Sequence, residues 1–159
     1  MESIDIPEAR SLEKVRAVVQ AICDGVKDKA KIADRAELSD RHLDYHRHAA
    51  RVIGLLEEQG ENWRVTKLGQ ELLATALRSP QEAAVLQRAI KGSVLMEAVP
   101  SLLDVVPPTL DTLAEALTEN PGLSPSTARK RGRALLAWRA YLREISVEAP
   151  LAEEPPSEP

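Results

Sequence analysis

Three cations near the start of a predicted C-terminal helix, Arg129, Lys130 and Arg133, have the type and spacing for contact with phosphate groups. At 100° per residue they lie opposite the apolar side of that helix. Ser126 and Thr127 precede them in the first turn, where unpaired backbone N–H groups also favour anions. Such groups position a helix on a phosphate backbone and can read base edges in the major groove. The pattern predicts a DNA-contacting helix.

The charge distribution favours this interpretation over a merely solvated helix face. Between Pro121 and Arg143 there are six basic residues and no acid. A net charge of −4 argues against a nucleic-acid binder, but five acids and no base follow Arg143, so the chain up to that residue carries +1. One of the six, Arg131, points toward the apolar side of the helix. We therefore expect it to be structural, paired with Glu115 or Asp111.

A second set of outward-facing bases is predicted on a helix between Ser39 and Gly54 and on the hairpin that follows it. The candidate contacts of this set are Arg41, Arg47, Arg51, Arg64 and Lys67. Nearby acids, including Asp40 and Asp44 on the helix, oppose phosphate binding, although a carboxylate can accept a hydrogen bond from cytosine. For this surface, DNA contact and a plain solvated face both stay open.

Helical periodicity and capping residues place this second set in a winged helix, which is a helix-turn-helix followed by a short hairpin. Ser11 can cap a first helix lined by Leu12, Val15, Val19, Ile22 and Val26. Apolar residues at 32, 33 and 36 predict a short helix, Leu38-Ser39 a turn, and Ser39 the cap of the helix that ends at Gly54. Strands at 55–57 and 63–65 flank a turn, and Thr66 can cap a helix from Lys67 to Leu77.

A second helix-turn-helix is predicted in the other half. Ser79-Pro80 begins a mostly helical segment, 81–103, broken near Gly92 and Pro100. A short helix from Leu110 to Leu117, a turn at 120–123 and a cap at Ser124 then lead into the final helix. The predicted fold is mainly α, with two tandem helix-turn-helix or winged-helix units and a small β-hairpin wing in the first. The boundaries are 1–10 (flexible lead), 11–78, 79–146, and 147–159 (disordered acidic, proline-rich tail).

The remaining reactive side chains predict no catalysis. His42 and His46 have metal-ligand spacing, but we place them on the inner helix face without a third ligand, so we predict structural histidines, no metal and no cofactor. A metal- or pH-sensing role stays open. Cys23 falls in an apolar helical pattern, which predicts a buried, inert thiol. There is no glycine-rich phosphate loop or activated nucleophile, and no membrane-length apolar run. We expect a cytoplasmic protein that is not an enzyme and does not associate with membranes.

Several short motifs resemble a known family. They comprise residues 40–46, Ala49-Ala50, residues 53–56 and 65–69, and then Ser124, Ser126, Thr127, Ala128, Arg131, Arg133 and Trp138. This pattern is similar to the winged-helix region of some type II restriction endonucleases and related defence proteins. The resemblance implies a DNA-recognition module of tandem winged helices. No nuclease domain accompanies it here, which implies a free-standing binder, a transcription regulator or the recognition part of a larger assembly.

The leading hypothesis from the sequence is a double-stranded DNA-binding protein that uses both units. The alternative is a winged-helix subunit that docks on a protein partner, in a defence or regulatory complex, without a DNA site of its own. In that case the acidic tail could steer a basic partner. Two recognition helices in one chain are compatible with a monomer, and a homodimer stays open.

Overall fold

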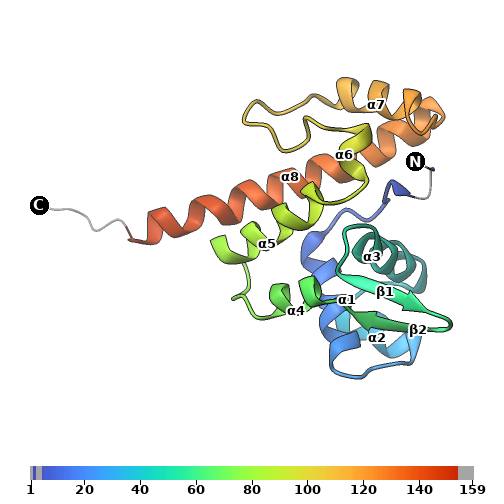
Figure 1. The fold of residues 1–159 in the computed structure, drawn as a ribbon, viewed down its shortest axis with the longest axis vertical. Helices are drawn as coiled ribbons and strands as arrows, with labels where there is room; N and C mark the ends of the chain where they lie inside the picture. Colours follow the sequence, from blue (N-terminus) through green and yellow to red (C-terminus); the bar gives the residue numbers. More distant parts are fainter. Residues whose placement is uncertain (1, 3–4, 154–159) are drawn as a thin grey trace, which may run out of the picture.

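The computed structural model describes residues 2 and 5–153, which form a mainly helical protein with one small hairpin (Figure 1). The elements in chain order are α1 (Leu12–Cys23), α2 (Lys29–Ala36), α3 (Asp40–Val52), β1 (Leu56–Gln59), β2 (Asn62–Val65), α4 (Lys67–Leu73), α5 (Pro80–Lys91), α6 (Leu95–Ala98), α7 (Leu110–Glu119) and α8 (Pro125–Glu153). This order agrees with the mainly α fold expected from the sequence. Among the described residues, every helix is too short or too polar to cross a lipid bilayer.

The helices with a predicted cap begin where the sequence predicts, because a hydroxyl side chain at each of these starts accepts a backbone N–H of the first turn. The Ser11 hydroxyl accepts from the N–H of Lys14 at 3.1 Å, and Ser39 does the same for His42 at 3.3 Å. The other predicted caps that make this contact are Thr66, Ser79 and Ser124. The predicted break after α5 is also confirmed, since that helix ends at Gly92 and only the short α6 follows.

The predicted hairpin is present, with strands slightly longer toward the turn. Its strands are antiparallel, and the register places Leu56 opposite Val65 and Glu57 opposite Arg64. Gly60 lies in the turn with a φ of +63°, a conformation that glycine adopts without steric cost. Gly54 likewise has a φ of +81° directly after α3, as the sequence predicts for the end of that helix.

Helices α4 and α8 differ most in length from the prediction. α4 ends at Leu73, not at Leu77, and just beyond its end the carbonyl of Thr75 accepts a hydrogen bond from the Arg16 guanidinium at 2.7 Å. α8 is assigned as far as Glu153, so its end overlaps residues 147–153 of the segment predicted to be a disordered tail. Residues 154–159 of the predicted tail lie outside the described part of the chain.

The N-terminal segment is packed against α8, which corrects the prediction of a flexible lead for residues 5–9. Ile6 and Ala9 are each 1 % exposed. The Trp138 indole N–H donates to the Ala9 carbonyl at 2.9 Å, and the Arg131 guanidinium donates to the Ile6 carbonyl at 3.0 Å. Backbone carbonyls of the segment therefore bind side chains of a helix more than a hundred residues away in sequence.

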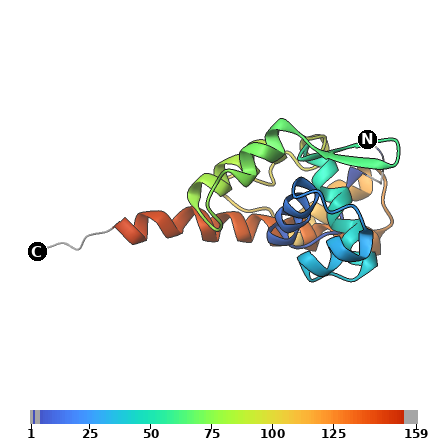
Figure 2. The same ribbon diagram turned by 90° about the horizontal axis from the view of Figure 1, so that it is seen from below.

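α8 organises the second half of the molecule. It packs against α7 near its start and against α5 further along, and Trp138 is fully buried at its centre. Its C-terminal part extends away from the body (Figure 2). In the first half, α1 lies against α2, α3 and β2. Buried residues of both halves belong to one continuous apolar cluster, so the two predicted units share a core.

Candidate nucleic-acid interface

The start of α8 exposes the predicted cations on a surface without neighbouring acids of its own helix. Ser126, Arg129, Lys130 and Arg133 are exposed, whereas Thr127 is half-buried and its hydroxyl accepts from that of Ser124 at 3.0 Å. Before Glu144, α8 contains no carboxylate. Within the described residues no ion pair engages Lys130 or Arg133. These two charges are available for an external anion.

Arg129 differs from its neighbours because it already has a carboxylate partner. Its guanidinium donates to the Asp111 carboxylate of α7 at 2.7 Å. Both side chains are substantially exposed, so solvent screens the pair and its contribution to stability is small. The pair nevertheless lowers the net positive charge at this end of α8.

Two other arginines of the basic segment serve the fold. The predicted partners of Arg131 are Glu115 or Asp111, but the contacts observed in the described residues are to the N-terminal segment: its guanidinium donates to the Ile6 carbonyl and lies 3.7 Å from the Glu8 carboxylate. Arg139 is buried, and its guanidinium donates to the carbonyls of Leu102 and Val105 at 3.1 and 3.2 Å. A buried guanidinium in these contacts holds the loop before α7 and is not available to a ligand.

The three candidate arginines of α3 have different environments. Arg41 is exposed, and its Nε donates to the Tyr45 hydroxyl at 2.8 Å. The Arg47 guanidinium lies 4.6 Å from the centroid of the Trp63 ring, and it also donates to Asp44 at 3.2 Å. Arg51 is half-buried, with Nη2 3.3 Å from Nδ1 of His48. Of the three, only Arg41 is exposed.

The hairpin and its surroundings are electrostatically balanced. Arg64 pairs with Glu57 on the opposite strand, and Asp44 of α3 accepts from both Arg47 and Lys29, the latter at 3.0 Å. Lys67 is exposed at the start of α4. These pairs reduce the positive potential that the first predicted unit presents to a phosphate backbone.

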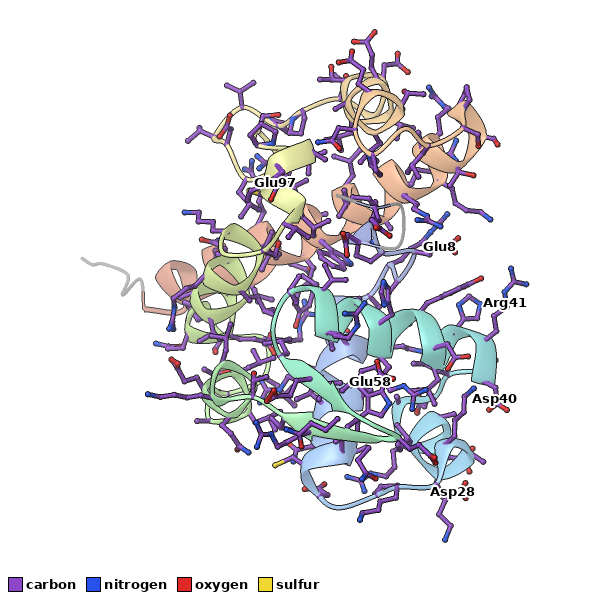
Figure 3. The ribbon with its side chains drawn as sticks, turned by 45° about the vertical axis from the view of Figure 1, so that its right-hand side comes forward. Glu8, Asp28, Asp40, Arg41, Glu58 and Glu97 are labelled. Atoms are coloured by element: carbon purple, nitrogen blue, oxygen red, sulfur yellow. The ribbon has the colours of Figure 1, made fainter. Side chains whose placement is uncertain are left out.

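Two of the predicted contact residues, one from each unit, line the same groove. Arg41 of α3 and Lys130 of α8 border a groove of about 660 Å³ between the first helices and the start of α8. Figure 3 shows Glu8, from the N-terminal segment, and Arg41 on facing sides of this region. Arg47 and Arg64 line a separate hollow of about 360 Å³ beside Trp63. Arg41 and Lys130 therefore line a different surface from Arg47 and Arg64.

The histidines of α3 are placed differently from each other. His46 is buried and its Nδ1 donates to the His42 carbonyl at 2.7 Å, whereas His42 is exposed, so the prediction that both lie on the inner face is wrong. Burial lowers the pKa of His46. In the described residues no three His, Cys, Asp or Glu side chains are grouped to hold a metal ion.

Cys23 is exposed at the end of α1, with Sγ 3.9 Å from the Gln70 side-chain oxygen, so the predicted burial of this thiol is wrong. The sequence feature that could have indicated exposure is the position of Cys23 in the last turn of α1, where the helix no longer faces the core.

No protein-family model matches the chain, and comparisons with curated proteins and with solved structures found no match.

Proposed function

We propose that this protein binds double-stranded DNA through α8 and α3, each acting as the second helix of a helix-turn-helix. The proposal is supported by the element order: α2, a turn, α3 and a hairpin follow one another as a winged helix requires, and α7, a turn and α8 follow one another as a helix-turn-helix requires. In such motifs the second helix enters the major groove and its N-terminal residues reach base edges. The first unit would supply a wing, whereas residues 79–153 of the second unit contain no hairpin.

The observation that carries the proposal is the face of α8 that contains Lys130 and Arg133. Both cations are exposed, no ion pair within the described residues engages them, and Ser126 precedes them by about one turn on the same stripe. Exposed cations at the start of a helix match the needs of phosphate contact, and the hydroxyl adds a hydrogen-bonding group. α3 is the weaker contributor because acids accompany its bases, and Arg41 is its strongest candidate.

The test is the binding of a labelled duplex, measured by fluorescence anisotropy at about 50 and 200 mM salt. We expect the wild-type protein to bind at low salt and to lose affinity steeply at high salt. The double variant Lys130→Ala/Arg133→Ala should bind at least about tenfold more weakly. The slope of log affinity against log salt concentration should also be smaller by about two, because two phosphate contacts are lost.

A matched control removes the same charge elsewhere. Arg88 and Lys91 lie on α5, away from the start of α8, and in the described part of the chain the ion pair of Arg88 is with Glu71, a pair accessible to solvent. The variant Arg88→Ala/Lys91→Ala should keep the wild-type affinity. Equal loss in both double variants would indicate a general charge effect, and unchanged binding in Lys130→Ala/Arg133→Ala would remove α8 from the interface.

One observation favours the second candidate function, a protein-docking subunit. Val105 and Val106, in the loop before α7, are 91 % and 78 % exposed, and adjacent exposed apolar side chains are common at protein interfaces. Duplex binding separates the two functions. If DNA binding is the function, the wild type binds the duplex and the variant Val105→Ser/Val106→Ser binds it equally well. If the wild type does not bind the duplex at either salt concentration, the docking role is favoured.

A further inference from the structure

The groove shared by Arg41 and Lys130 has an excess of positive charge. Its volume is about 660 Å³, within the range of small-molecule sites. Its basic side chains come from four places: Arg10 in the N-terminal segment, Lys14 in α1, Arg41 in α3 and Lys130 in α8. Only two carboxylates, Glu8 and Glu37, accompany them.

The four cations are not neutralised by direct pairing. Lys14 donates to the backbone carbonyl of Glu37 at 2.9 Å, and Arg41 donates through Nε to Tyr45. Glu8 lies 3.7 Å from Arg131, a residue that does not line the groove. Within the described residues, no carboxylate lies within ion-pair distance of Arg10, Lys14, Arg41 or Lys130. The groove is therefore suited to an anion with at least two negative charges.

The α3 wall of the groove provides aromatic surface and a hydrogen-bond acceptor. The rings of His42 and Tyr45 meet edge to face, with centroids 5.7 Å apart. His46 also lines the groove and is 4 % exposed. Its Nδ1 faces the His42 carbonyl, which accepts only, so in the neutral ring Nε2 is an acceptor. No donor in the described part of the chain reaches this Nε2 atom.

We propose that this groove binds a phosphorylated small molecule of nucleotide size. Arg10, Lys14 and Lys130 would hold the phosphate by charge-assisted hydrogen bonds, and a planar group would lie against Tyr45 and His42. An N–H group of the ligand would supply a donor for His46 after a small shift of the ring. The site joins the N-terminal segment, α1, α3 and α8, so an occupant would link the two halves of the molecule.

A small molecule fits the groove better than a DNA backbone does. The groove contains two more basic than acidic side chains, which is an excess of two positive charges. Each phosphodiester group of a DNA backbone carries only one negative charge, so a single one does not balance this excess. The inference does not depend on DNA binding, because the ligand can be measured without DNA.

The experiment titrates the full chain with adenosine 5′-monophosphate, followed by calorimetry and by backbone amide chemical shifts. Inorganic phosphate and uncharged adenosine are the comparison probes. We expect saturable binding of the monophosphate, weaker binding of phosphate, and no binding of adenosine. The shifted amides should cluster at residues 8–14, 38–46 and 130. The variant Arg10→Ala/Lys14→Met should bind about tenfold or more weakly, because each charge-assisted contact contributes at least this much.

The control variant is again Arg88→Ala/Lys91→Ala, which should bind the monophosphate like the wild type, and thermal melting should show that the groove variant is folded. Absence of saturable binding by both the monophosphate and phosphate at low salt would overturn the proposal. The proposal would also be overturned if the amide chemical shifts changed mainly outside the groove, or if Arg10→Ala/Lys14→Met and Arg88→Ala/Lys91→Ala lost equal affinity for the monophosphate. If neither small probe binds but Arg10→Ala/Lys14→Met weakens duplex binding, the groove belongs to the DNA surface and the small-molecule site is refuted.

Discussion

The guanidinium of Arg16 lies 2.7 Å from the carboxylate of Glu82, and the two side chains are 8 % and 1 % exposed. Arg16 belongs to α1 and Glu82 to α5, so this buried pair joins the two predicted units. Glu82 also accepts from the Tyr141 hydroxyl at 2.6 Å and from the backbone N–H of Arg78 at 3.1 Å. One carboxylate therefore connects α1, the start of α5 and α8.

Replacing this carboxylate should destabilise the whole protein. In Glu82→Gln the Arg16 guanidinium would stay buried without its charge partner, and breaking such a pair costs about 3–5 kcal/mol. We expect a loss of this size in the free energy of unfolding, measured by urea denaturation. Glu71→Gln is the matched control, because its pair with Arg88 is exposed, and it should cost no more than about 1 kcal/mol. Similar losses in both variants would contradict the assigned role of Glu82.

Gly69 should tolerate no larger residue. A Cβ atom there would lie 2.4 Å from the carbonyl oxygen of Leu55 and 2.7 Å from Cγ1 of Val65, so the hairpin and α4 would have to separate. We expect Gly69→Ala to lower the free energy of unfolding by about 1–3 kcal/mol or more. At Gly92 the nearest atom would be 3.4 Å away, and Gly92→Ala should be nearly neutral. Equal unfolding midpoints for the two variants would show that the close packing at Gly69 can relax.

His46 should make stability depend on pH. Burial lowers the pKa of His46 in the folded protein; the hydrogen bond to the His42 carbonyl opposes part of this effect, and the charges of His42 and Lys14 lower the pKa further. In the unfolded chain it titrates near its ordinary value of 6.5. The unfolded state therefore binds the proton first as pH falls, and the free energy of unfolding decreases below about pH 6.5, by up to about 1.4 kcal/mol per pH unit.

The measurement compares thermal melting at pH 7.5 and 5.5 for the wild type, His46→Gln and the exposed-site control His42→Gln. We expect the drop between the two pH values to be smaller in His46→Gln than in the other two proteins. An unchanged drop in His46→Gln would assign the pH dependence to other groups.

Asp111 should restrain DNA binding through its pair with Arg129. In Asp111→Asn one negative charge is lost and the guanidinium becomes available, so we expect duplex affinity to rise about threefold to tenfold at low salt. Glu97→Gln, on α6, changes the net charge equally and should have a smaller effect, because it does not pair with a cation of α8. Equal gains in anisotropy titrations would indicate that net charge, and not this pair, controls the affinity.

Local signals accounted for most element boundaries. The caps at Ser11, Ser39 and Thr66 could be predicted because each depends on a hydroxyl and a backbone N–H three residues later. The contacts of Arg131 could not, because its partners Ile6 and Glu8 are more than a hundred residues away in sequence and gain their position only when the chain is folded.

The candidate interface was less predictable than the fold. Helical spacing correctly placed Lys130 and Arg133 on the exposed side of α8, but it gave no information on which cations would meet an acid. Arg129 meets Asp111 from another helix. The groove around Arg41 and Lys130 likewise arises from the packing of the two halves, which no periodicity in either half encodes.

The burial of Trp138 gives the protein a built-in optical reporter. The chain has two tryptophans: Trp138 is fully buried against the N-terminal segment, and Trp63 is partly exposed on the hairpin beside Arg47. Their emission should differ in wavelength and in quenching by acrylamide, because only one indole contacts water. In Trp63→Phe the remaining fluorescence reports release of residues 5–9 from α8, and each half of the molecule can be followed during unfolding or ligand binding without an attached dye.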